Sequence, residues 1–136
     1  MLRINFTNKR IFSFDGPNLS FLGNETDFLD LAKSIVDLTA IGVSKNIEIM
    51  NMNFVRNEGE EIEIYFSSRS EANLLGTFDN NNRLLFELDP RYWERMFKYF
   101  ILMSWDKKTY YLNNYEDCLS DLDLEQECNF ICSSEF

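Results

Sequence analysis

The sequence contains no histidine, and this absence excludes many kinds of chemistry. Without histidine there is no Ser–His or Cys–His nucleophile pair and no HExxH zinc site. The side chain best suited to proton transfer near neutral pH is missing as well. Glycine is also scarce: five residues stand singly, so there is no glycine-rich phosphate loop and no dinucleotide-binding fingerprint. We therefore expect a protein that is not an enzyme and that uses no cofactor.

Long apolar runs and a secretion signal are also lacking. The most apolar run, YFILMSW at residues 99–105, is far shorter than the roughly 20 residues of a membrane helix. The first twelve residues alternate polar and apolar side chains and contain no apolar signal core. Three cysteines, all near the C-terminus, are typical of reduced thiols in a cytosol. We expect a cytoplasmic protein with a single domain over residues 1–136.

Positive charge is absent from the last part of the chain. Residues 1–108 hold all 13 basic residues and 16 of the 23 acidic ones, whereas residues 109–136 hold seven acids and no base. Within that end, YYLNNYEDCLSDLDLEQECNF carries three tyrosines and six carboxylates. Such a segment repels nucleic acid and anionic membranes and attracts basic proteins. We therefore expect neither nucleic acid nor membrane as a partner.

The chain has enough apolar residues for a core, because 45% of it is hydrophobic and 13 residues are phenylalanine. Residues 46–54 alternate but change phase near Met50, which a bulge or two short strands would explain. Residues 74–78 and 83–88 predict a hairpin joined by an Asp-Asn-Asn-Asn turn. Alternation predicts further strands at residues 2–7, 10–15 and 60–66.

Two helices are predicted. Apolar side chains recur every three or four residues between 23 and 42, with Asn24 or Thr26 as the N-cap and Gly42 as the stop. Asp89-Pro90 indicates the start of a second helix, which we favour to about residue 103, although residues 98–105 could instead form a buried strand. The order of elements predicts an α+β fold, with a mainly antiparallel sheet and two principal helices packed on one face.

Patterns that could support catalysis or metal binding are weak. Glu61 and Glu63 share one side of a strand, as paired catalytic carboxylates must, but we interpret them as its solvated side. Asp121, Asp123 and Glu125 match the first ligand positions of a calcium loop, which then lacks its glycine and its closing glutamate. The three cysteines lack a fourth zinc ligand, and we interpret them as small, partly buried hydrophobes. We predict no metal site.

The tyrosines and acids near the C-terminus are the best candidate for a functional site. Tyrosine rings anchor protein interfaces, while carboxylates steer the encounter and pair with Arg or Lys. An acidic run that is merely a solvated face is the alternative interpretation. We predict a partner-binding surface formed by Tyr110, Tyr111, Tyr115, Glu116, Asp117, Asp121, Asp123 and Glu125.

This layout resembles the small acidic immunity proteins of bacterial toxin systems, including those of contact-dependent growth inhibition and polymorphic toxins. The resemblance rests on the strand–helix–strand opening (RIFSF, FLGNETDFLDLAKSIVDLT, NIEIMNMNF), the short histidine-free chain and the tyrosine–carboxylate cluster. It implies a non-catalytic inhibitor that binds and neutralises a cognate toxin domain, often a nuclease with a basic surface. The alternative is an acidic scaffold, adaptor or oligomeric structural subunit without a toxin partner.

Overall fold

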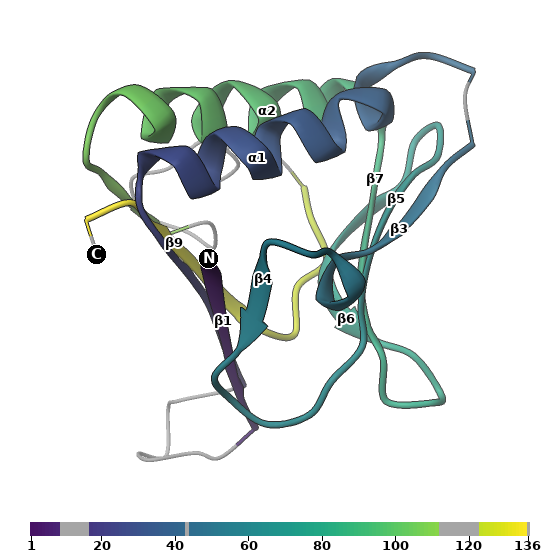
Figure 1. Ribbon diagram of the computed structural model, residues 1–136. Coiled ribbons are helices and arrows are strands. Elements are labelled where there is room, and N and C mark those ends of the chain that lie inside the picture. The colour runs from purple at the N-terminus through teal and green to yellow at the C-terminus, as the bar shows by residue number, and fades with distance from the viewer. Residues whose placement is uncertain (9–16, 43, 112–122, 136) are drawn as a thin grey trace.

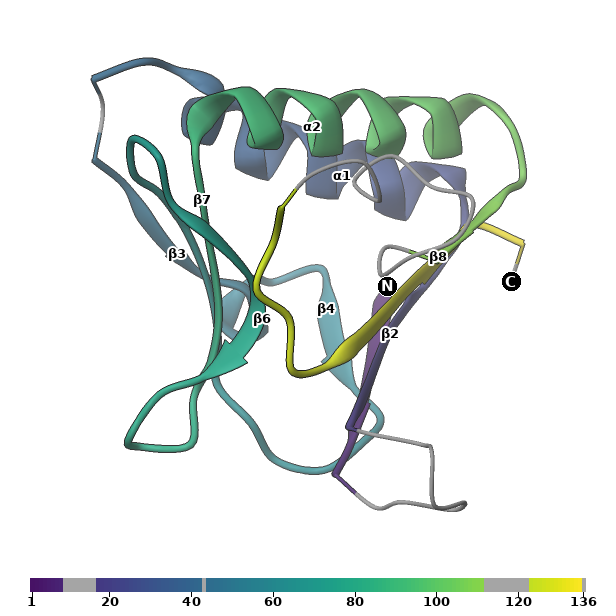
Figure 2. The same ribbon diagram turned by 180° about the vertical axis from the view of Figure 1, so that it is seen from behind.

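The computed structural model describes residues 1–8, 17–42, 44–111 and 123–135. Two helices lie side by side across the top of two β-sheets, and the inner faces of the sheets turn toward each other below the helices (Figures 1 and 2). The α+β class and the two principal helices are therefore confirmed. The expected strand at residues 10–15 falls outside the described residues.

The first sheet has five strands in the order β4-β1-β2-β9-β8. The β1–β2 and β8–β9 pairs are antiparallel, whereas β1 runs parallel to β4 and β2 runs parallel to β9. The inward positions of β1 and β2 carry fully buried aliphatic and aromatic side chains. The strands are β1 (Leu2–Thr7), β2 (Asn18–Leu22), β4 (Val55–Asn57), β8 (Thr109–Tyr111) and β9 (Asn129–Ser133).

The second sheet has four strands in the order β3-β5-β7-β6: β3 (Asn46–Glu48), β5 (Ile64–Ser68), β7 (Leu84–Leu88) and β6 (Asn73–Phe78). The predicted hairpin is confirmed as the antiparallel β6–β7 pair, but β7 also runs parallel to β5. Antiparallel pairs outnumber parallel ones among the described strands, in line with a mainly antiparallel arrangement, but the strands form two mixed sheets instead of the one expected. β7 lies between β5 and β6 in the sheet. Its inward side chains are all buried, as is typical of a strand with neighbours on both sides.

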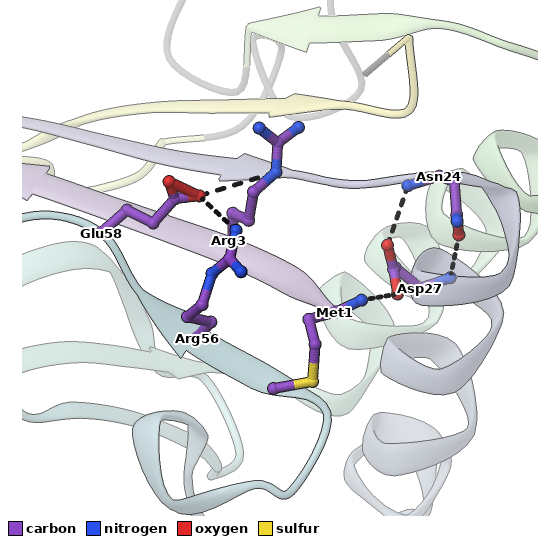
Figure 3. Close-up of polar contacts among 6 residues, drawn as sticks. All are labelled: Met1, Arg3, Asn24, Asp27, Arg56 and Glu58. Carbon is purple, nitrogen blue, oxygen red and sulfur yellow. Dashed lines mark hydrogen bonds and ion pairs between the residues drawn. The ribbon is translucent and has the colours of Figure 1, made fainter.

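Helix α1 (Glu25–Ile35) begins at Asn24, one of the two predicted caps. The Asn24 side chain accepts from the Asp27 amide at 3.0 Å, and the Asp27 carboxylate accepts from the Asn24 amide at 2.9 Å, which is a capping box. The amino group of Met1 lies 3.1 Å from the other Asp27 oxygen and ties β1 to the helix start (Figure 3). A 3₁₀ turn, η1 (Val36–Thr39), continues the helix, so regular α-structure ends before the predicted stop at Gly42.

Helix α2 (Pro90–Trp105) begins where Asp89-Pro90 predicted it, with the Asp89 side chain accepting from the Arg91 amide at 2.9 Å. The favoured helix over residues 98–105 is confirmed, and the strand alternative is wrong. The helix is one-sided despite its apolar sequence: Phe100 and Met103 are fully buried, whereas Trp105 is 84% exposed. No helix in the described part of the chain has both the length and the apolar character needed to cross a membrane.

Aromatic side chains join the two sheets and α2 into one core. The Phe21 ring of β2 lies 6.1 Å from that of Phe66 in β5, and the Phe130 ring of β9 lies 5.0 Å from that of Phe86 in β7. Trp93 of α2 lies 4.9 Å from Phe66, and its indole N–H donates to the Ser67 carbonyl at 2.8 Å. All five rings are fully buried, so the inner faces of both sheets are occupied by packing and leave the outer faces and edges for function.

The phase change near Met50 has a simple structural cause. Residues 46–48 form β3 in the four-stranded sheet, residues 49–51 form a 3₁₀ turn (η2, Ile49–Asn51), and the chain then enters β4 of the five-stranded sheet. Of the two explanations offered by the sequence, two short strands is the one observed.

Candidate functional site

The predicted C-terminal surface is described only in part. Tyr115, Glu116, Asp117 and Asp121 lie outside the described residues. Tyr110, Tyr111, Asp123 and Glu125 are described, and they come from two places: the edge strand β8 and the extended segment that precedes β9.

The two tyrosines of β8 point to opposite sides of the five-stranded sheet. Tyr110 pairs with the buried Cys132, and its ring lies 4.8 Å from that of Tyr99 in α2, so it faces the helices. Tyr111 pairs with Ile131 on the outer face and is 51% exposed. Tyr111 therefore presents its ring to solvent, while Tyr110 contributes to packing.

Asp123 and Glu125 lie on residues 123–128, which we call the connector. The connector runs beside β6, the edge of the four-stranded sheet, before it turns into β9 (Figure 2). The Leu75 amide donates to the Glu125 carbonyl at 2.8 Å, and the Glu125 amide donates to the Asn73 carbonyl at 2.9 Å. Asp123, Glu125 and Glu127 are all exposed. These acids therefore stand on ordered backbone, but beside a different sheet from Tyr111.

The cysteines and acids of this end were also considered as metal ligands. Cys128 and Cys132 are buried, and burial raises the pKa of the Cys128 thiol to about 12. Cys118 lies outside the described residues. Within the described ranges, no group of three or more Cys, Asp or Glu side chains is arranged to hold a metal ion.

A cleft of about 500 Å³ carries a second group of acids, which the sequence did not lead us to predict as a site. It opens between η2, β4, residues 61–63 and the tip of the β6–β7 hairpin. Three carboxylates line it, those of Glu48, Glu61 and Glu63, together with four asparagine side chains. Arg83 contributes the cationic side chain of its lining.

The cleft is negative because its carboxylates lack cationic partners. Glu48 accepts from the Asn51 amide group and Glu63 from the Tyr65 hydroxyl, but none of the three acids forms an ion pair with a described cation. The guanidinium of Arg83 is already held by Asp79, with 2.7 Å between Nε and Oδ2, and it lies over the Tyr65 ring. Partial burial and the charges of Glu48 and Glu63 raise the pKa of Tyr65 above its usual value.

Local backbone pairing brings Glu61 and Glu63 to the cleft. The Glu58 amide donates to the Ile4 carbonyl and the Glu60 amide to the Phe6 carbonyl, both at 2.8 Å, so the chain follows β1 beyond the end of β4. Gly59 is required here, because a Cβ atom would stand 2.4 Å from the Phe6 nitrogen. Residues 48–63 hold five acids and one base, and this high density of acids is the sequence feature that could have pointed to the cleft.

The described cations are mostly engaged within the molecule. Eleven Lys and Arg side chains are described, and at least eight of them form ion pairs: Arg3, Lys45, Arg56, Arg69, Arg83, Arg91, Lys98 and Lys108. The acids of the cleft and the connector therefore remain as uncompensated negative charge on an ordered surface.

Comparisons with protein-family models, with curated proteins and with solved structures give no match. Function is therefore inferred from the residues and geometry of this chain.

Proposed function

We propose that the chain is a non-catalytic immunity protein that binds and neutralises a cognate bacterial toxin domain with a basic surface. The observation that supports this best is the set of carboxylates without cationic partners, held on ordered backbone in the cleft and the connector. Glu48, Glu61 and Glu63 thereby join Asp123 and Glu125 as candidate contacts. A nuclease-type toxin attracts such acids for the same reason that it attracts nucleic acid.

Charge complementarity would also make the chain bind a basic toxin domain quickly. Electrostatic steering raises association rates toward ~10⁸ M⁻¹s⁻¹ at low salt. A cell that must neutralise a toxin before it acts gains from that speed. We therefore expect tight, salt-sensitive binding in which the acids set the rate of encounter and apolar contacts hold the complex.

The cleft suits binding better than acid–base catalysis. Paired carboxylates that exchange protons work in sites from which water is excluded. Glu61 and Glu63 are both exposed to solvent, and the chain has no histidine to assist them. Their arrangement supports recognition of Lys or Arg side chains.

The decisive experiment uses the C-terminal domain encoded by the reading frame immediately upstream of this gene. That domain is expressed in a host cell with and without this chain, and growth is followed. We expect growth to be restored and the two proteins to elute as a stoichiometric complex that weakens at high salt. Absence of both protection and a complex would remove the proposal.

The exposed end of α2 favours a second candidate, an oligomeric scaffold. Trp105 is 84% exposed and Leu102, one helical turn before it, is 48% exposed. Two large apolar side chains on one helix face are a common feature of subunit contacts. Sedimentation would show a salt-insensitive oligomer if this candidate is correct, and a Trp105→Ala variant would return it to the monomer.

A further inference from the structure

The outer face of the four-stranded sheet differs from its inner face in what covers it. Ile64 and Phe66 of β5 point inward and are fully buried, so the alternate residues Tyr65 and Ser67 point outward. The helices lie over the inner side, and no helix of the described part of the chain lies over the outer side (Figure 1). Among the described residues, this outer face therefore lacks the helical cover that the inner face has.

The middle of the outer face is apolar. Tyr65 and Leu85 stand directly opposite each other across the β5–β7 pair, and Leu74 stands opposite Glu87 across β6 and β7. Each of these side chains is partly exposed. Tyr65 stands between Leu85 on β7 and Glu48 on β3, and the Arg83 guanidinium lies 5.5 Å from its ring centroid, so Leu74 and Leu85 supply the apolar part of this face beside an aromatic ring. Aromatic and aliphatic side chains are common at the centre of protein interfaces.

Both margins of this face are negative. Glu48 pairs with Tyr65 across β3 and β5, and Glu48 and Glu63 are also walls of the acidic cleft. At the opposite edge, the connector places the exposed Asp123 and Glu125 beside β6.

The cations on the outer face are already engaged. Arg69 lies 2.9 Å from Glu87, and Arg83 lies 2.7 Å from Asp79. The unpaired charge that a partner meets around the apolar middle is therefore negative, as a basic partner requires.

We infer that the outer face of the four-stranded sheet is the docking surface for a basic protein partner, whose apolar side chain covers Leu74 and Leu85 while a Lys or Arg enters the cleft between Glu48 and Glu63. This inference rests on the proposed function and specifies where that partner binds. It assigns the connector acids to the margin of the interface and leaves Tyr111, on the outer face of the other sheet, outside it.

A matched pair of variants tests the location. Leu85→Arg and Ile131→Arg place the same cation at partly exposed outward positions, in β7 and β9 respectively, each of which has a strand on both sides. With the upstream-encoded toxin domain as the probe, we expect Leu85→Arg to weaken binding at least tenfold and to abolish protection. Ile131→Arg should stay within about twofold of the parent. Equal effects of the two variants, or the reverse order, would overturn the inference.

A second pair guards against a folding defect in Leu85→Arg. Glu48→Lys with Glu63→Lys reverses two charges at the docking face, and Glu25→Lys with Asp30→Lys makes the same change on α1. All four proteins are first compared by thermal unfolding. We expect weaker binding of the toxin domain from the first pair and not from the second, and similar binding by both pairs would contradict the inference.

A probe that does not depend on the toxin separates the two proposals. Isotope-labelled parent protein is titrated with a nona-arginine peptide, and the amide shifts are mapped by NMR. We expect the largest shifts at Glu48, Glu63 and Leu85, and largest shifts at β8 or on α1 would overturn the inference. If the peptide maps to this face but the chain gives no protection, the toxin assignment fails and the docking face stands. If the chain protects cells from the toxin domain but the peptide and the variants identify another surface, the docking-face inference is wrong and the proposed function remains.

Discussion

The outer faces of the two sheets carry opposite kinds of charge, and they handle it differently. On the five-stranded sheet, Arg3 and Arg56 lie directly opposite each other across β1 and β4. Glu58 bridges them, at 3.7 Å from Arg3 and 3.3 Å from Arg56 (Figure 3). On the four-stranded sheet, Glu48 and Glu63 have no such bridging cation and border an apolar centre instead. Arg3 and Arg56 are neutralised locally on one face, whereas Glu48 and Glu63 form no ion pair among the described residues on the other.

This difference between the outer faces separates the demands of folding from those of function. The inner faces of both sheets are alike, since both are built from fully buried apolar side chains. Folding therefore places the same demand on both sheets and does not explain why their outer faces differ. An outer face with unpaired charge around an apolar centre is the better candidate for selection by a partner.

The largest effect is expected from a pair of glycines, Gly59 beside β1 and Gly76 within β6. Gly59→Ala would force a Cβ atom against the Phe6 backbone and separate β1 from the chain beside it, at a cost of about 3 kcal/mol. Gly76 has φ +78° at the bulge of β6, where an alanine has room but is strained, at about 1 kcal/mol. Urea unfolding should rank the two variants in this order. Equal losses in the free energy of unfolding would mean that the backbone at Phe6 moves away and accommodates the new Cβ atom at position 59.

The next effect compares a buried carboxylate with an exposed one. Asp89, which joins β7 to α2, is 5% exposed, and the Arg91 side chain together with backbone amides lowers its pKa to about 2. Because the folded-state pKa lies below that of the unfolded chain, this stabilisation is present above about pH 4 and is lost as the pH falls toward 2. Asp89→Asn should therefore lower the free energy of unfolding by about 2 kcal/mol at pH 7. It should also make that free energy depend less on pH at acidic pH, because the variant lacks the carboxylate that titrates there.

The matched change on the five-stranded sheet is Glu58→Gln, which breaks exposed ion pairs and should change stability by less than about 1 kcal/mol. Urea unfolding at neutral and acidic pH measures both variants. If Asp89→Asn loses stability with falling pH as steeply as the parent, the lowered pKa of Asp89 is not a cause of the acid sensitivity.

A smaller effect is expected on the rate of encounter with the toxin domain. Glu48→Gln with Glu63→Gln removes unpaired charge from the four-stranded sheet and should slow association about tenfold at low salt. Arg3→Gln with Arg56→Gln removes positive charge from the other face and should leave the rate unchanged or raise it. Stopped-flow mixing distinguishes these outcomes, and equal slowing by both pairs would show that only total charge matters.

The smallest effect concerns Tyr65, whose pKa is raised by partial burial and then by Glu48 and Glu63. The Glu48→Gln, Glu63→Gln variant should therefore lower the pKa of Tyr65, whereas the Arg3→Gln, Arg56→Gln variant should not. Carbon NMR of labelled tyrosine follows the titration. No change in the first variant would show that burial alone sets this pKa.

Local signals in the sequence predicted the local elements. Asp89-Pro90 predicted the start of α2, and Asn24 caps α1 as expected. The Asp-Asn-Asn-Asn turn predicted the β6–β7 hairpin, and alternation predicted a strand that overlaps β5. The split into two mixed sheets was not predictable in this way. It depends on the parallel β2–β9 and β5–β7 pairs, which join strands that do not follow each other in the chain, so no local turn sequence predicts them.

The candidate site was predictable in composition but not in place. The sequence predicted that Glu61 and Glu63 would be solvated, and both are exposed. It did not predict that η2 and the hairpin tip would complete a cleft around them, because this convergence is tertiary. The acids and tyrosines of the C-terminal end were read as one group, whereas Tyr111 and Glu125 stand beside different sheets. Spacing along the chain does not say which sheet edge a segment joins.

The pairing of β2 with β9 has a consequence for how this chain emerges from a ribosome. Asn18 and Asn129 form a side-chain hydrogen bond across 111 residues. At about 5–20 residues per second, β2 has been translated for roughly 5–20 seconds before its neighbour exists. During that interval one edge of the nascent β1–β2 pair is open to other chains, so rapid synthesis or chaperone protection favours a correctly folded product.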